Sequence, residues 1–135
     1  MNPDVAPADD VSAEWWEATR EHRLVVQTCR ACGHAQHPPR AVCTACSSLE
    51  ALEFVAASGL GTVDSWTVVH RAPRPDVPTP YTIARVRLVE GPILLTVIDS
   101  PDEPALDDPV EVAWSDLPDG RALPVFRPTN PPREA

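Results

Sequence analysis

Apolar and polar residues alternate in short runs along most of this chain, and β-branched residues are frequent in these runs. Alternation with a period of two predicts half-buried strands rather than helices. The clearest run places Ala84, Val86 and Leu88 on one face and Arg85 and Arg87 on the other, so we expect the first set to face a core. The predicted strands cover residues 23–28, 53–58, 61–71, 81–89, 93–99, 110–114 and 122–126.

Two segments depart from this alternation. Residues 93–99 (ILLTVID) form a more continuous apolar run, which is typical of a strand covered on both faces. Residues 72–80 (APRPDVPTP) contain four prolines, which indicate a stiff, exposed loop rather than regular structure. The strands on either side of this loop should therefore be joined by a long connection.

Residues 12–22 (SAEWWEATREH) predict the one helix of the chain. Ser12 is a favourable N-cap, and Glu14 lies in the first turn, where a negative charge suits the helix dipole. The adjacent Trp15 and Trp16 cannot reach the same depth on one face of a short helix. The helix therefore either packs on its own domain or presents one tryptophan to a partner subunit, where aromatic anchors dominate binding.

All four cysteines lie in one stretch, CRACGHAQHPPRAVCTAC, as two CxxC pairs. Two such turns supply four thiolates to one point, which is the ligand set of closed, structural zinc sites. Four converging thiolates repel one another without a cation, so the metal should help to hold this region folded. We expect one structural zinc ion, bound by Cys29, Cys32, Cys43 and Cys46.

Other uses of these cysteines fit the sequence less well. Disulfides require an oxidising compartment, and no signal peptide is expected at the N-terminus, so we expect a cytoplasmic protein. Iron in the same four-thiolate cage, as in a rubredoxin, stays open because the ligand set does not exclude it. His34 and His37 lie between the pairs, and either is a less favoured substitute ligand.

The predicted elements combine into a mainly β fold. We expect an N-terminal tail and helix (1–22), a four-cysteine zinc ribbon (23–58), and a small five-stranded antiparallel barrel of the OB type (59–128), followed by a loose tail (129–135). No apolar run approaches the length of a membrane span, so no membrane insertion is expected.

Charge narrows the choice of partners. The formal net charge is −9, and the stretch from Asp99 to Asp119 holds acidic residues without a basic one. Phosphate backbones attract basic surfaces, so this balance argues against a nucleic-acid partner. The arginine-richer stretch from Arg20 to Arg87 is either solvated surface or a site for an anionic ligand or an acidic partner.

The order of these motifs resembles a known family. The segments RLVVQTCRACGHAQHPPRAVCTAC, SWTVVHR and PYTIARVRLVEG resemble the rubredoxin-like zinc-ribbon plus OB-fold proteins linked to acyl-CoA metabolism, long catalogued as a domain of unknown function. The resemblance runs from about Trp15 to Pro128. The sequence departs from the family pattern at His22, where the family often has Gly, and at Asp107–Asp108, where it often has Gly-Met.

The resemblance implies a role without catalysis of its own. Members of this family are partners of thiolase-superfamily enzymes, including thiolases and thiolase-like aldolases that cleave steroid side-chain CoA thioesters. It implies a hetero-oligomer with such an enzyme, and acyl-CoA as a ligand that the OB domain helps to hold. No catalytic residues are predicted in this chain, because no spare cysteine, nucleophile elbow or phosphate loop is present.

Three residues are candidate contacts for CoA or for the partner: Arg40, His70 and Arg71. His70 and Arg71 are adjacent at the end of a predicted strand, where they can bind a phosphate or a carboxylate, or simply tie down the proline-rich loop. Arg40 follows Pro38–Pro39, which stiffens its position. Two other functions stay open: a rubredoxin-like iron electron carrier, and an OB-fold binder of single-stranded nucleic acid, which the acidity makes the least favoured.

Overall fold

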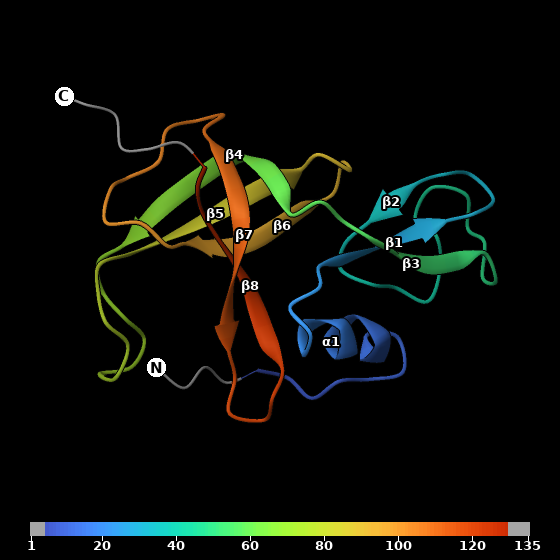
Figure 1. The fold of residues 1–135 in the computed structure, drawn as a ribbon, viewed down its shortest axis with the longest axis horizontal. Helices are drawn as coiled ribbons and strands as arrows, with labels where there is room; N and C mark the ends of the chain where they lie inside the picture. Colours follow the sequence, from blue (N-terminus) through green and yellow to red (C-terminus); the bar gives the residue numbers. More distant parts are fainter. Residues whose placement is uncertain (1–4, 130–135) are drawn as a thin grey trace.

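A computed structural model describes residues 5–129 as one helix, a three-stranded sheet and a five-stranded closed barrel (Figure 1). This confirms the predicted mainly β fold. The helix is α1 (Ala13–Thr19), the sheet holds β1 (Val25–Cys29), β2 (Ala35–Gln36) and β3 (Leu52–Ala56), and the barrel holds β4 (Leu60–Val69), β5 (Tyr81–Leu88), β6 (Ile93–Ile98), β7 (Pro109–Asp116) and β8 (Ala122–Pro128). Only β2 was not predicted, because two residues are too few to show a pattern.

Helix α1 begins after Ser12, as predicted, but Ser12 does not cap it with its side chain. Instead, its hydroxyl donates a hydrogen bond to the Asp9 carboxylate (2.8 Å), and this bond lowers the pKa of Asp9. The helix ends three residues earlier than predicted, and His22 turns the chain into β1 with a φ of 54°. Glycine adopts that left-handed conformation without strain, which agrees with the glycine that the resemblance leads us to expect at this position.

The barrel strands follow the order β4-β5-β6-β8-β7, and all neighbours are antiparallel except β6 and β8. These two strands are parallel and pair at a single position, Ile98 opposite Phe126. Ala84, Val86 and Leu88 of β5 are buried, as predicted. The prediction that β6 is covered on both faces is wrong, because Leu95 is 76% exposed, so β6 alternates like its neighbours.

One hydrophobic core joins the helix, the three-stranded sheet and the barrel. Trp15 and Val26 belong to the same buried cluster as Val63 and Phe126, and α1 lies between the sheet and the lower part of β8 (Figure 1). Trp16 is partly buried under the Arg121 guanidinium, whose central carbon lies 4.5 Å from the ring centroid. The structure therefore supports self-packing of α1 rather than a free tryptophan anchor.

The connection between the sheet and the barrel is short, since only residues 57–59 separate β3 from β4. Gly59 has a φ of 81°, and a Cβ there would lie 2.5 Å from a side-chain methyl of Val112. Glycine is thus required both by the backbone and by the close approach of β7. Within residues 5–129, no helix is long and apolar enough to cross a membrane.

Candidate metal centre

The two CxxC pairs fold into two turns with the same backbone hydrogen bonds. The carbonyl of the first cysteine in each pair accepts a bond from the amide four residues later: Gly33 to Cys29 (2.7 Å) and Ser47 to Cys43 (2.9 Å). In each turn, the residue whose amide donates this bond has a left-handed backbone, with a φ of 80° at Gly33 and 66° at Ser47. The pairs therefore present their sulfur atoms in equivalent ways from opposite sides.

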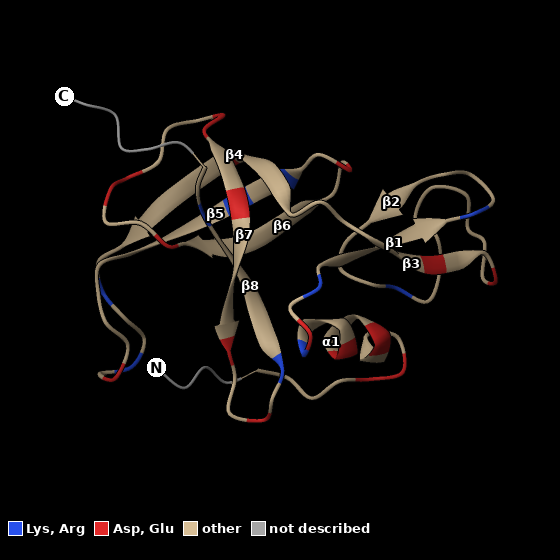
Figure 2. Ribbon diagram, viewed as in Figure 1, with Lys and Arg blue, Asp and Glu red and all other residues tan. Residues whose placement is uncertain are grey.

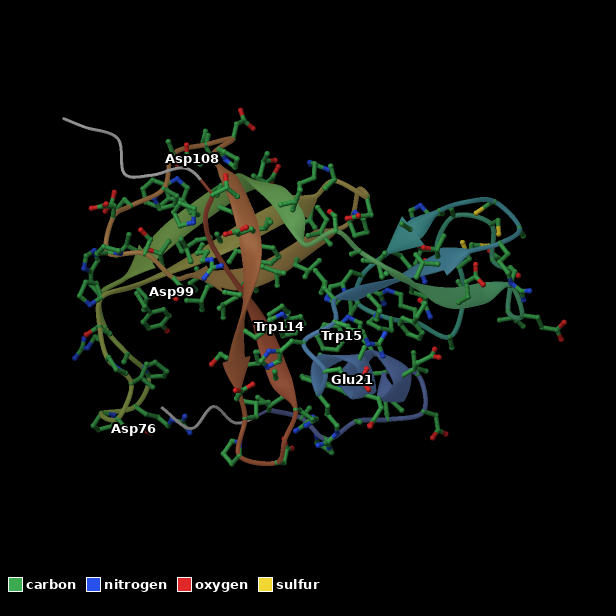
Figure 3. The ribbon with its side chains drawn as sticks, viewed as in Figure 1. Trp15, Glu21, Asp76, Asp99, Asp108 and Trp114 are labelled. Carbon is green, nitrogen blue, oxygen red and sulfur yellow. The ribbon has the colours of Figure 1, made fainter. Side chains whose placement is uncertain are left out.

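The four Sγ atoms, all within 4.8 Å of one another, lie at the end of the three-stranded sheet away from the barrel, where the sulfur atoms of Figure 3 gather. Sγ of Cys29 is 3.6 Å from that of Cys46, and Sγ of Cys32 is 3.6 Å from that of Cys43. Tetrahedral zinc with Zn–S bonds of about 2.3 Å places its sulfurs roughly 3.8 Å apart. The cluster is therefore the right size for a metal ion, and it fits zinc.

Local hydrogen bonds prepare one thiol for metal binding. The backbone amides of Cys46 and Ala45 lower the pKa of Cys43 to about 6, against partial desolvation that raises it. The His34 amide lowers the pKa of Cys32, but desolvation and the other three sulfurs raise it to about 12 overall. Without a cation the cluster cannot ionise completely. A divalent ion resolves this repulsion, so metal binding should release protons.

Neither histidine between the pairs joins the cluster. The Nε2 atom of His34 lies 3.1 Å from the Thr44 hydroxyl. The ring of His37 packs against Trp15 with 5.6 Å between centroids, and burial lowers the pKa of His37 to about 4. The ligand set is therefore four sulfurs, which leaves no open position for catalysis on a tetrahedral ion.

The structure does not bring the other three predicted residues together. The backbone of Arg40 is held by the Gln27 side chain through bonds of 2.9 Å to both its amide and its carbonyl, while its side chain is exposed. His70 and Arg71 are exposed just after β4, and the 70–80 segment lies at the end of the barrel away from the three-stranded sheet (Figure 1). The ten residues of β4 alone span roughly 30 Å.

One feature was missed at the sequence level. A groove of about 760 Å³ runs between the ends of β4 and β6 on one side and the β7–β8 hairpin on the other. Its walls include His70, Tyr81, Asp99 and Trp114. The acidic stretch after β6 was visible in the sequence, but its position opposite Trp114 depends on the strand order of the barrel.

Comparison with known proteins agrees with both parts of the fold. The "ChsH2, rubredoxin-like zinc ribbon domain" matches residues 16–53, and the "ChsH2, C-terminal OB-fold domain" matches residues 54–115. A solved chain of the "Ltp2-ChsH2(DUF35) aldolase" superposes with a TM-score of 0.83 at 37% identity. That superposition covers 93% of this chain and 100% of the other.

Curated relatives differ in length. A "Probable enoyl-CoA hydratase alpha subunit" of Thermomonospora curvata is 40% identical over 92% of this chain, which spans only 39% of that relative. The "3-oxo-4,17-pregnadiene-20-carboxyl-CoA hydratase alpha subunit" of Mycobacterium tuberculosis is 35% identical over 80% of this chain and 35% of its own length. A "DUF35 domain-containing scaffold protein" of Pyrococcus furiosus is 33% identical over 76% of this chain and 74% of its own length. The chain therefore belongs to the DUF35 family, the family of ChsH2, in which a rubredoxin-like zinc ribbon is joined to an OB-fold domain.

Proposed function

We propose that this chain is a non-catalytic subunit that docks on a thiolase-superfamily enzyme, a thiolase or thiolase-like aldolase, and helps it to bind an acyl-CoA substrate. The observation that carries this proposal is the 37% identity to a chain of the Ltp2-ChsH2 aldolase, over the whole length of that chain. The steroid hydratase relative makes CoA thioesters of steroid side chains the candidate substrate class.

The chemistry of the described residues supports a role without catalysis. The four cysteines are committed to one metal site. Among residues 5–129, the close histidine–carboxylate pair is His22 with Asp116, whose Nε2 and Oδ1 atoms are 2.6 Å apart. This pair stacks on Trp114 and has no hydroxyl or thiol hydrogen-bonded to it, so it lacks the nucleophile that such a pair would activate.

Arg40, His70 and Arg71 enter this proposal as two separate contacts. His70 lines the groove and the exposed Arg71 follows it in the sequence, so both can contact one phosphate or carboxylate. Arg40 projects from the ribbon and would meet a different part of the partner or of CoA. Metal-bound thiolates rather than disulfides suit a reducing compartment, so we assign the complex to the cytoplasm.

The test is purification of the tagged full-length chain from its native host, with identification of the bound enzyme by mass spectrometry. We expect a thiolase-superfamily enzyme in a stable ratio to this chain, and its cleavage or condensation of an acyl-CoA should fall when this chain is withheld. An enzyme that is fully soluble and fully active alone would rule the proposal out.

A second candidate partner is an enoyl-CoA hydratase. In the relatives named hydratase alpha subunits, the segment similar to this chain makes up 39% and 35% of their length, so a related segment occurs joined to further sequence in such subunits. The same purification separates the two candidates, because the bound enzyme would then hydrate an enoyl-CoA thioester.

A further inference from the structure

The groove beside β8 has apolar walls from all five strands of the barrel. Val68 of β4, Val97 of β6, and Leu123 and Val125 of β8 line it. Tyr81 and Trp114 add aromatic surface, and Figure 3 labels Trp114 on the hairpin side. A groove of about 760 Å³ with apolar walls is of the size that proteins use for binding.

Strands β6 and β8 are held together where they line the groove. Ile98 of β6 pairs with Phe126 of β8, the Asp99 amide donates a hydrogen bond to the carbonyl of Phe126 (2.7 Å), and the Thr96 hydroxyl donates one to the carbonyl of Pro124 (3.0 Å). These contacts fix the separation of the strands while leaving the surface above them uncovered. The groove is therefore preformed, which lowers the entropic cost of filling it.

The rim of the groove is acidic. Asp99, Asp102 and Glu103 line it, all three are exposed, and the loop after β6 carries several acidic positions in Figure 2. In the described part of the chain none of the three forms an ion pair, and Arg85 and Arg87 pair with Asp64 instead. Covering unpaired carboxylates with an apolar or anionic ligand would be costly.

We propose that this groove binds a segment of the partner enzyme in which apolar side chains are flanked by arginine or lysine. The inference rests on the proposed function, because it names how the partner is held. Apolar side chains of the segment cover Val97 and Val125, and its basic residues pair with the carboxylates of the rim. The same carboxylates disfavour a phosphate group next to Asp99, Asp102 and Glu103.

Photo-crosslinking in the native host locates the segment. Tyr81 is replaced by benzoylphenylalanine, which keeps an aromatic ring in the wall, and Leu49, which is 74% exposed on the ribbon, is replaced in a matched control. We expect the Tyr81 probe to crosslink a peptide of the co-purifying enzyme that contains apolar residues next to Arg or Lys. A crosslinked peptide that is acidic, or one from a second copy of this chain, would overturn the inference.

Charge reversal measures the contribution of the rim. The double variant Asp102→Lys/Glu103→Lys should weaken association with the purified enzyme by about tenfold or more, and added salt should weaken the wild-type complex. The control variant Asp10→Lys/Glu50→Lys makes the same change in net charge at exposed positions outside the groove and should retain wild-type affinity. Docking at the groove is contradicted if both variants lose the same affinity for the enzyme, or if neither variant loses any.

The outcomes also separate this inference from the proposed function. If the enzyme co-purifies, yet the Tyr81 probe gives no crosslink to it and the rim variant binds normally, the groove is not the docking site and the proposed function stands. If no enzyme co-purifies with the full-length chain, the proposed function fails and the inference fails with it.

Discussion

His37 connects the pH of the solution to the stability of the fold. Burial against Trp15 lowers its pKa from 6.5 to about 4, so the folded protein holds His37 neutral where the unfolded chain binds a proton. Between these two pKa values the unfolded state binds more protons, and stability therefore rises with pH and falls on acidification. The full loss of stability is reached only below the pKa of His37 in the folded protein, which is about 4.

We expect His37→Phe to flatten this dependence while keeping an aromatic ring against Trp15. Between about pH 7.5 and about pH 5, the wild type should lose roughly 2 kcal/mol of unfolding free energy more than the variant. Denaturant unfolding with saturating zinc at both pH values measures the difference. Parallel losses in the two proteins would mean that another group controls the acid sensitivity.

Single residues differ in how far the sequence could place them. The four cysteines were predictable because their spacing forces a common geometry, and the structure brings their sulfur atoms together. Arg40, His70 and Arg71 were chosen by local features, and local features carry no information on distance across the fold. The barrel separates Arg40 from the other two by the length of β4.

The two CxxC turns have the same backbone hydrogen bonds, so the residues at equivalent positions in them can be compared directly. Gly33 and Ser47 occupy equivalent left-handed positions, but only one of them is glycine. A side chain at a left-handed position costs about 1 kcal/mol, partly offset by the entropy that glycine loses on folding. The second turn is therefore the less favourable of the two.

The substitution pair Ser47→Gly and Gly33→Ala tests this difference. Ser47→Gly should stabilise the zinc-bound protein by about 0.5 kcal/mol, and Gly33→Ala should destabilise it by about 1 kcal/mol. A Cβ at Gly33 meets no atom within 4 Å, so backbone strain alone causes the second effect. Denaturant titration of both variants measures these two changes in stability. A Gly33→Ala variant more stable than the wild type would contradict the left-handed backbone at Gly33.

Strands were the most predictable elements because a period of two is visible over five or more residues. The inward face of β5 follows directly from it. The apolar run of β6 misled the prediction, because composition alone cannot show that Leu95 faces solvent. The pairing of β6 with β8 and the groove beside it depend on contacts between distant segments, which no local pattern contains.

At the scale of the whole molecule, the ribbon and the barrel share one core and should unfold together. Trp15 and Val26 pack in the same cluster as Phe126, so loss of the metal site removes support from the barrel as well. A zinc ribbon joined to the barrel only by a flexible linker would instead unfold in a transition of its own. The number of thermal transitions therefore distinguishes the two arrangements.

Metal removal should lower the midpoint of a single transition by at least about 10 °C, with tryptophan fluorescence and strand circular dichroism changing together. Cys29→Ser should reproduce this loss without a chelator. Elemental analysis of the colourless protein should give about one zinc per chain, whereas a red, iron-containing protein would support the electron-carrier alternative. A barrel that melts unchanged after chelation would contradict the shared core.

The continuous core also sets an order of events in the cell. Newly made chains hold the barrel, and hence the groove beside β8, less stably until a metal ion has joined the four cysteines at the other end of the molecule. Chains made when metal is scarce would be cleared by proteolysis rather than stored. The abundance of any enzyme that depends on this subunit would then follow the supply of a metal that takes no part in its chemistry.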